Sequence, residues 1–179
     1  MKGLHVRDGR RGDAGGIEEV TLAAYQQYGA VMPPALWDRY RQNIVATLAA
    51  APPQRQIVAE ENGRIVGSVL LYPTGTEIVR PGGGSVTLAL PEVRLLAVAP
   101  STRGKGIGAL LMGECVRRAR ESGARALTLH TTDMMEAAMR LYVRMGFQRL
   151  PDLDFEPAPG IAVKGFRLDL SGGGASEMS

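Results

Sequence analysis

A strand–turn–helix–strand segment in the second half of the chain constrains the fold more than any other feature. Glu92 to Val98 is expected to form an apolar strand, and Gly106 to Glu121 a helix whose apolar residues recur every fourth position. Ala126 to Thr131 is expected to form the next strand. A helix that joins two strands in this way is typical of a right-handed crossover, which sets the two strands parallel in one sheet.

The remaining segments predict a mixed order of elements. They are a strand at residues 4–7, a helix that Asp13 caps, a helix from Pro33-Pro34 onward, strands at 56–60 and 65–71 joined through Asn62-Gly63, a Gly/Pro-rich loop at 73–85 with a returning strand at 86–90, a helix at 133–145, and short strands around Phe147 and at 161–168. This order predicts one α/β (α+β) domain over residues 1–170, with a mixed central β-sheet flanked by helices. Residues 171–179 are small and polar and are expected to form a flexible C-terminal tail.

Composition limits the classes of function. With 45% hydrophobic and 22% charged residues, the chain is typical of globular proteins. It has no apolar run of the roughly 20 residues that cross a bilayer, and its start lacks the apolar core of a signal peptide. These features predict a cytoplasmic protein that does not bind membranes. The net charge of +3 is scattered, its densest cluster (Arg117, Arg118 and Arg120) is expected on a solvated helix face, and few aromatic residues accompany it, so nucleic acid is not an expected partner.

The counts of cysteine and histidine exclude further chemistries. A single cysteine, Cys115, cannot form an internal disulfide. Together with His5 and His130 it supplies too few ligands for a zinc site, so no metal is expected. His130 lies on an apolar strand and is expected at the edge of the core.

The turn before the helix carries the clearest signal of function. The segment Arg103-Gly104-Lys105-Gly106-Ile107-Gly108 combines three alternate glycines with two cations. Glycine allows positive φ and close approach of a ligand, and the first turn of a helix offers unpaired N–H groups and a partial positive charge. The pattern predicts a cradle for a pyrophosphate, although glycine could also serve only the geometry of the turn.

A dinucleotide site is a weaker interpretation of the same residues. Gly104 to Ala109 satisfies the pattern G-x-G-x-x-G/A, but five residues, Ala99 to Arg103, separate the strand from the first glycine. The next strand also ends without the expected acid, and nearly half of the chain precedes the motif. A Walker A loop is excluded, because no glycine lies five residues before Gly104.

The turn resembles motif A of the GNAT superfamily of N-acetyltransferases, whose signature (R/Q)-x-x-G-x-(G/A) is met by Arg103, Gly106 and Gly108. The segment Leu141-Tyr142-Val143-Arg144-Met145-Gly146-Phe147 resembles the family's LYxxxGF motif B. The two motifs have the family's usual separation, and the similarity spans residues 4–170. The resemblance implies a GNAT-like fold, in which the strand Glu92 to Val98 splays from its neighbour at a bulge.

The resemblance also implies acetyl-coenzyme A as the co-substrate. The backbone of Leu96, Ala97 and Val98 would pair with the pantetheine arm, and an N–H near Val98 would stabilise the developing oxyanion. The N–H groups of the turn would hold the pyrophosphate. Cofactor binding is thereby assigned to Arg103, Gly104, Lys105, Gly106, Ile107, Gly108 and Ala109.

Two residues are candidates for catalysis by the same resemblance. Tyr142 matches the family's tyrosine that protonates the departing thiolate, whereas the alternative is a core tyrosine on the helix stripe. Glu92 begins the central strand, where some members carry the general base for the amine; the alternative is a strand-end glutamate facing solvent. Met135 stands where the family commonly has an asparagine that contacts the cofactor arm.

The implied activity is transfer of an acetyl group to a primary amine by direct attack in a ternary complex. The acceptor stays open between a small molecule and an amine of a peptide or protein, and the oligomeric state stays open too, a homodimer included. The family's acceptor loop corresponds to Tyr28 to Pro34; the nearby Tyr25, Trp37 and Tyr40 could line an amine pocket or belong to the core. Two rival interpretations are a non-catalytic acyl-coenzyme A-binding module of the same fold and a nicotinamide-dependent oxidoreductase.

Overall fold

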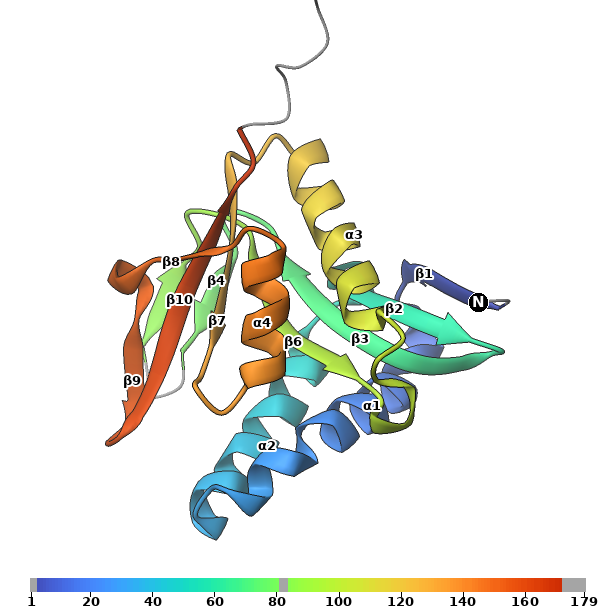
Figure 1. Ribbon diagram of the computed structural model, residues 1–179, viewed down its shortest axis with the longest axis horizontal. Coiled ribbons are helices and arrows are strands. Elements are labelled where there is room, and N and C mark those ends of the chain that lie inside the picture. Colours follow the sequence, from blue (N-terminus) through green and yellow to red (C-terminus); the bar gives the residue numbers. More distant parts are fainter. Residues whose placement is uncertain (1–2, 81–83, 172–179) are drawn as a thin grey trace, which may run out of the picture. The chain divides into compact units, whose positions relative to one another are not determined.

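The computed structural model describes residues 3–80 and 84–171 (Figure 1). The chain divides into two compact units. Unit 1 comprises Met1–Leu71 and Arg94–Glu114, and unit 2 comprises Tyr72–Val93 and Cys115–Ser179. The expected tail lies outside the described residues apart from Ser171, as do residues 81–83 of the expected Gly/Pro-rich loop.

Unit 1 combines antiparallel strands with two complete helices and the start of a third. Its elements are β1 (Leu4–Asp8), α1 (Ala14–Tyr25), α2 (Pro34–Ala50), β2 (Gln56–Glu61), β3 (Arg64–Tyr72) up to Leu71, β6 (Glu92–Val98) from Arg94, and α3 (Ile107–Glu121) up to Glu114. β1 pairs antiparallel with β2, β2 pairs antiparallel with β3, and β6 follows β3 in the sheet. α1 and α2 lie side by side (Figure 1).

Local sequence signals begin and turn these elements as expected. α2 begins at Pro34, whose fixed φ suits the first position of a helix. Asn62 and Gly63 have φ values of 52° and 78°, and both central residues of a type I′ hairpin turn need positive φ. Asp13 precedes α1, but its carboxylate accepts the N–H of Arg10 at 2.7 Å instead of capping that helix.

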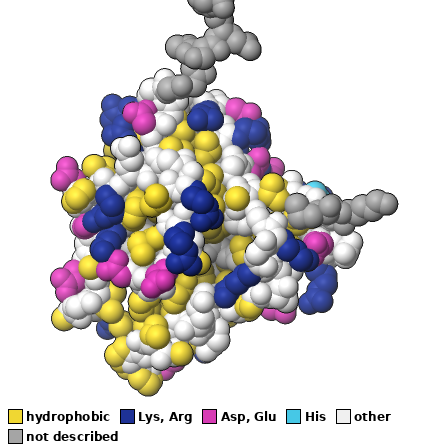
Figure 2. Space-filling model, viewed as in Figure 1, with side chains coloured by type: hydrophobic (Ala, Val, Ile, Leu, Met, Phe, Trp, Pro, Cys, Tyr) yellow, Lys and Arg dark blue, Asp and Glu magenta, His cyan; other side chains and the backbone are white. Residues whose placement is uncertain are grey.

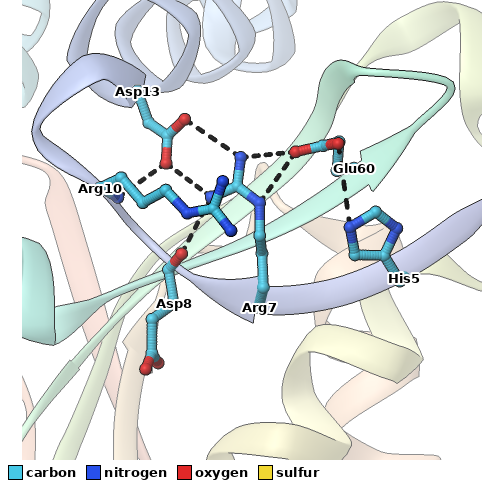
Figure 3. A network of polar contacts seen from close by, with 6 residues as sticks. All are labelled: His5, Arg7, Asp8, Arg10, Asp13 and Glu60. Atoms are coloured by element: carbon cyan, nitrogen blue, oxygen red, sulfur yellow. Dashed lines mark hydrogen bonds and ion pairs between the residues drawn. The ribbon is translucent and has the colours of Figure 1, made fainter.

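An ionic network fastens β1 to β2 and to the start of α1 (Figure 3). Arg7 on β1 donates from Nη1 to Asp13 Oδ2 at 2.6 Å and from Nε to Glu60 Oε2 at 2.8 Å. The hydrogen bond from Arg7 is the main reason why the pKa of the Asp13 carboxyl is lowered. His5 faces the same Glu60, with 3.8 Å between Nε2 and Oε1. Arg7 is therefore the centre of a structural clamp.

The core of unit 1 holds the glycine turn by fixing the elements on both of its sides. Side chains that are almost completely buried include Ile17, Ile44, Ile57, Leu70, Ile107, Leu111 and Met112. A Cβ added to Gly67 of β3 would lie 3.0 Å from the carbonyl oxygen of Ala97 and equally close to the side chains of Ile107 and Leu111. Only glycine at this position lets β6 and α3 approach β3 so closely.

Unit 2 is built on β7 (Ala126–Thr131) and β10 (Ile161–Asp169), which pair antiparallel along their length. The start of β6 pairs parallel with β7, with Glu92 opposite Thr128 and Val93 opposite Leu129. Its remaining elements are β4 (Glu77–Val79), β5 (Ser85–Thr87), α4 (Glu136–Arg144), β8 (Gln148–Arg149) and β9 (Phe155–Ala158), besides the end of α3. β8 and β9 pair with β10, and β4 and β5 form a separate two-stranded sheet.

The α/β class with a mixed sheet is thus confirmed, and the strands expected at residues 92–98 and 126–131 have those bounds. The structure departs from the expectation in some details. β4 lies inside the loop expected at residues 73–85, and β5 covers residues 85–87 where a strand at 86–90 was expected. β9 is absent from the sequence prediction because it contains Pro157, which argues against a strand unless the strand lies at an edge. α4 begins at Glu136 rather than Asp133, because Met135 has a ψ of 49° and its N–H closes a turn onto Thr132 O at 3.0 Å.

The backbone of β6 departs from extended geometry at Leu95, which has a φ of 50°. This left-handed conformation is uncommon for a residue other than glycine, and it marks the bulges that interrupt a strand. The bulge implied for this strand by the family resemblance therefore has a counterpart at Leu95. The boundaries of the single domain expected from the sequence stay a prediction.

Charges of both signs are interspersed on the face of the molecule that Figure 2 shows. Figure 2 shows Lys and Arg side chains next to Asp, Glu and apolar side chains, and not as one continuous basic band. On α3, Arg117 forms an ion pair with Glu121 one turn further along. Within residues 3–80 and 84–171, none of the helices combines the length and the apolar character that a membrane crossing requires.

Candidate active site

The turn between β6 and α3 in unit 1 has the geometry of an anion cradle. Gly104 and Gly106 have φ values of 80° and 77°, a conformation that side-chain-bearing residues rarely adopt. A Cβ added to either glycine would meet no atom within 4 Å, so both positions face open space. α3 begins at Ile107, and the N–H groups of its first turn have no acceptor inside the helix. This arrangement fits a diphosphate that approaches the backbone.

Arg103, the first residue of the motif, is held by the end of α1. Its Nη2 donates to the carbonyl oxygen of Ala24 at 3.0 Å, and its Nη1 donates to Gln27 Oε1 at 3.3 Å. A cation at the carboxyl end of a helix is favoured by the helix dipole. The guanidinium therefore has a fixed place beside the turn, although its present acceptors belong to the protein.

Lys105 lies between the two left-handed glycines and has an acidic partner. Its Nζ lies 3.3 and 3.4 Å from the two carboxylate oxygens of Glu61, at the end of β2. The lysine side chain is 45% exposed, so this pair contributes little to stability. An anion from solvent can therefore replace Glu61 as the partner of Lys105 at a small cost in free energy.

The three strand residues assigned to the pantetheine arm precede this turn on β6. Ala97 is buried, whereas Leu96 and Val98 are half-buried. All ten residues assigned to the cofactor therefore lie in unit 1, on the strand end, the turn or the first positions of α3 between residues 96 and 109. Among them, Ala97 and Ile107 are buried.

The two residues assigned to catalysis lie in unit 2, and Glu92 has an unexpected environment. Glu92 is only 3% exposed, so the alternative of a strand-end glutamate facing solvent is wrong. Its Oε2 lies 3.4 Å from Nδ1 of His130 on β7 and 3.8 Å from Nη2 of Arg80, which follows β4. A buried carboxylate needs such partners, because burial without them would be costly.

Neither His130 nor Arg80 was predicted from the sequence as a neighbour of Glu92. His130 has the half-buried place at the edge of the core that its strand predicts, but its two ring nitrogens also have polar neighbours, with Nε2 2.9 Å from the carbonyl oxygen of Leu153 and Nδ1 3.4 Å from Glu92. In a parallel pair with Glu92 opposite Thr128, His130 lies two residues further along the neighbouring strand, on the same face. Only the register between the strands reveals this proximity.

Tyr142 lies on α4, and the spacing of the LYxxxGF motif is explained by how that helix ends. Gly146 has a φ of 89°, its N–H bonds to Val143 O, and the N–H of Phe147 bonds to Tyr142 O, each at 3.0 Å. These two bonds form a Schellman motif, which brings the residue after the glycine back onto the helix. The rings of Tyr142 and Phe147 accordingly lie 5.9 Å apart. Tyr142 is 6% exposed, which fits a core residue as well as a proton donor.

Met135, which replaces the family's asparagine, is 9% exposed and directly precedes α4. Its thioether cannot donate a hydrogen bond, so any contact with a cofactor arm would be apolar. The side chain packs instead as a residue of the core.

The aromatic residues near the expected acceptor loop form a connected cluster in unit 1. Tyr25 has its ring centroid 5.7 Å from that of Tyr28 and 6.0 Å from that of Tyr40, and Trp37 lies 6.1 Å from Tyr40. Tyr25 and Trp37 are buried, which agrees with a place in the core. Burial also raises the pKa of the Tyr28 and Tyr40 hydroxyls, so both stay protonated at neutral pH.

Two other chemistries find no basis in the part of the chain that the structure describes. Cys115 is completely buried, so its thiol cannot act as an acyl carrier at the surface. No group of three or more His, Cys, Asp or Glu side chains in residues 3–80 and 84–171 is arranged to hold a metal ion.

Comparison with known proteins agrees with this geometry. Residues 19–147 match the model of the Acetyltransferase (GNAT) family. An uncharacterized N-acetyltransferase of Schizosaccharomyces pombe is 29% identical over 115 residues, which are 64% of this chain and 63% of the yeast protein. The match thus spans less than two thirds of that relative.

Solved structures show the same fold. A GNAT family acetyltransferase from Brucella melitensis, in complex with acetyl-CoA, has a TM-score of 0.62 at 24% identity and covers 100% of this chain and 93% of its own. The acetyltransferase yncA from Salmonella typhimurium, with its cofactor acetyl-CoA, has a TM-score of 0.63 at 18% identity and covers 99% and 100%. On its fold, its glycine turn and the match over residues 19–147, this chain belongs to the acetyltransferase (GNAT) family.

Proposed function

We propose that this protein transfers the acetyl group of acetyl-coenzyme A to a primary amine. The observation that carries the proposal is the turn of unit 1, where Gly104 and Gly106 have positive φ and face open space directly before the first turn of α3. Membership of the acetyltransferase family supports the same reaction, and the two structural relatives that hold acetyl-CoA support the same cofactor.

In this proposal the backbone of unit 1 binds the cofactor. The N–H groups from Arg103 to Ala109 bind the diphosphate, and the charges of Arg103 and Lys105 add to its attraction. The backbone of Leu96, Ala97 and Val98 pairs with the pantetheine arm in the manner of an added strand. Glycines at the turn keep side chains out of the path of the diphosphate.

One backbone amide and two side chains act in the chemical steps. Acetyl-coenzyme A supplies a thioester whose carbonyl carbon an amine can attack. An N–H near Val98 donates to the thioester oxygen while negative charge develops there. Tyr142 protonates the departing thiolate, which is feasible because phenols and thiols have ordinary pKa values of about 10 and 8.5. Glu92 removes a proton from the acceptor, since an amine with a pKa near 10 arrives as an ammonium ion.

The acceptor attacks directly in a ternary complex with cofactor and enzyme. The buried Cys115 leaves no thiol at hand for a covalent acyl-enzyme. The amine belongs to a small molecule or to a peptide or protein.

A non-catalytic acyl-coenzyme A-binding module is the second candidate. One observation favours it: Glu92 and Tyr142 are only 3% and 6% exposed. Such a module would bind the cofactor through the same turn without using either side chain.

A thiol-release assay separates the two candidates. The protein is incubated with acetyl-coenzyme A and a broad panel of amines, and free coenzyme A is measured with a thiol reagent. The proposal expects release that depends on an added amine. Binding of acetyl-coenzyme A without release for any amine would establish the binding module instead.

A further inference from the structure

We infer that Glu92 and His130 take up one proton as a pair, and that this pair, rather than Glu92 alone, receives the proton of the acceptor amine. The inference rests on the proposed acetyl transfer. It gives a role to a histidine that the mechanism above does not use.

Both members of the pair lie in unit 2 and are largely shielded from solvent. Their side chains are 10% exposed for His130 and 4% exposed for Glu92, and 3.4 Å separates Nδ1 from Oε2. Few water molecules can screen an interaction in such a place, so the charge of one group acts strongly on the other. The parallel pairing of β6 with β7 fixes the distance between them.

The hydrogen bond on the other side of the imidazole decides where its first proton lies. Nε2 of His130 lies 2.9 Å from the carbonyl oxygen of Leu153. A carbonyl oxygen only accepts, so Nε2 carries the hydrogen. In a neutral imidazole Nδ1 is then bare, and its lone pair faces the Glu92 carboxylate, which also only accepts. One added proton on Nδ1 turns this repulsive contact into an attractive one.

Arg80 and Phe155 also lie beside the pair. Arg80 Nη2 lies 3.8 Å from the same Oε2 of Glu92, and its guanidinium lies over the Phe155 ring, 4.9 Å from the centroid. The ring of Phe155 also meets His130 edge-on, at 5.4 Å between centroids. The positive charge of Arg80 opposes proton uptake by the pair.

Asp154 is the other acid near the histidine, and its charge is already engaged. Its carboxylate accepts two hydrogen bonds from Arg149, at 2.8 and 2.7 Å, and one from the N–H of Gly165 at 2.8 Å. These bonds lower the pKa of Asp154 to about 2, and the bond from Arg149 has the largest effect. Asp154 therefore stays ionised, and Glu92 is the carboxylate that responds to the proton on His130.

A pair of this kind suits the reaction better than a lone carboxylate. Isolated carboxyl groups take up a proton near pH 4 and imidazoles near pH 6.5, whereas an amine acceptor gives one up near pH 10. General-base catalysis is most effective when the base takes up its proton near the working pH. The histidine supplies that basicity, and the glutamate stabilises the charge that results.

The protons balance over one turnover. The ammonium gives its first proton to the pair, where it resides on Nδ1 of His130. The amine forms its bond to the carbonyl carbon, and the carbon–sulfur bond breaks. The thiolate takes the proton of Tyr142, and the second proton of the former ammonium replaces it on the tyrosine. The pair then releases its proton to solvent.

Nuclear magnetic resonance of the two histidine side chains tests the proton directly, without cofactor or substrate. Long-range ¹H–¹⁵N spectra of the protein with ¹⁵N-labelled histidine report on each ring nitrogen. We expect His130 to carry its hydrogen on Nε2 at high pH and to gain a second one on Nδ1 as the pH falls. Glu92→Gln should make this uptake less favourable, because the carboxylate that faces Nδ1 is removed.

Glu60→Gln is the matched control, since Glu60 faces the other histidine. His5 lies 3.8 Å from Glu60, but its side chain is 55% exposed (Figure 3). Solvent screens this pair, so the uptake by His5 should move much less. A bare Nε2 at high pH, or a His130 uptake that ignores Glu92→Gln, would overturn the inference.

The pH dependence of acetyl transfer tests the role of the pair. The acid limb of the rate profile should coincide with the uptake seen by resonance. His130→Gln should move that limb at least one unit lower and reduce kcat on the plateau about tenfold, with the affinity for acetyl-coenzyme A unchanged. His5→Gln should change neither quantity.

An acid limb that stays in place in His130→Gln would refute the role of His130. If no amine were acetylated by the unaltered protein, the proposed function and with it the role in catalysis would fail. The spectra would still decide whether Glu92 and His130 share a proton.

Discussion

Both the glycine turn of unit 1 and the cluster of Glu92, His130 and Arg80 in unit 2 contain charged side chains, but the two sites differ in how far these side chains are exposed to solvent. In the turn, Lys105 is 45% exposed and has a partner that an anion can replace. In the cluster, the side chain of Glu92 is 4% exposed and faces a histidine and an arginine. Exposed cations beside open space suit the binding of an anion from solvent, whereas a buried carboxylate beside an imidazole suits the movement of a proton. In the proposed function, the turn therefore binds the cofactor and the pair of Glu92 and His130 takes part in the chemistry.

The largest expected effect is the loss of cofactor binding at the glycine turn. Gly106→Glu adds a side chain at a φ of 77° and places bulk and negative charge in the open space of the cradle. The dissociation constant for acetyl-coenzyme A should rise at least a hundredfold, measured by isothermal titration calorimetry.

Gly113→Glu is the matched control for that variant. Gly113 lies on α3, an added Cβ there also meets no atom within 4 Å, and its φ is not positive. The control should bind like the unaltered protein. If Gly106→Glu and Gly113→Glu bound acetyl-coenzyme A with equal affinity, the cofactor would not bind at this turn.

The next effect concerns the chemistry side. Tyr142→Phe removes the proposed proton donor but keeps the ring against Phe147. We expect kcat to fall by about ten- to a hundredfold, with the dissociation constant for acetyl-coenzyme A within about twofold.

Tyr72→Phe removes a hydroxyl from another buried tyrosine of unit 2, one without a proposed role in catalysis. Its kcat should stay near that of the unaltered protein. If the kcat of Tyr142→Phe equalled that of Tyr72→Phe, Tyr142 would be a core residue without a role in catalysis.

A smaller effect separates charges that serve the fold from those that serve function. Asp13→Asn weakens the Arg7 clamp. It should lower the free energy of unfolding at pH 7 by about 1–2 kcal/mol, measured by urea denaturation. The folded pKa of Asp13 lies below its ordinary value of 3.8, so its stabilising effect is complete above that value and is lost as the pH falls. The difference between Asp13→Asn and the unaltered protein should therefore shrink below pH 4.

Asp38→Asn, on an exposed position of α2, should change stability little at either pH. Neither variant should alter kcat. A gap between Asp13→Asn and the unaltered protein that stays constant down to pH 2 would mean that the clamp does not depend on the charge of Asp13.

The smallest effect sharpens the description of the turn. Glu61→Gln removes the acidic partner of Lys105 and should tighten the binding of acetyl-coenzyme A by about two- to threefold at low salt. The gain should disappear at high ionic strength, because salt screens exposed pairs. Glu19→Gln, an exposed change on α1, serves as the control, and an equal gain there would point to net charge instead of Glu61.

Features that depend on neighbours in the sequence were predictable, and those that depend on strand register were not. Asn62-Gly63 specifies its own turn, and the glycines of Gly104 to Gly108 specify theirs, because each acts through φ. β9 escaped prediction because its stability comes from pairing with β10 and outweighs the cost of Pro157.

The same limit applies to the candidate site. The LYxxxGF motif encodes a Schellman helix end within seven residues, so sequence alone marks it. The contact between Glu92 and His130 joins two strands across a crossover, and a shift of one residue in their pairing would place the histidine on the opposite face. Sequence therefore indicated Glu92 as a candidate and gave no sign of its partner.

A crystal structure with acetyl-coenzyme A tests the central claim most directly. The account predicts the diphosphate on the N–H groups of Ile107, Gly108 and Ala109, with Lys105 turned from Glu61 towards it. A cofactor bound elsewhere, or a turn filled by a side chain of the protein itself while the cofactor is present, would contradict it.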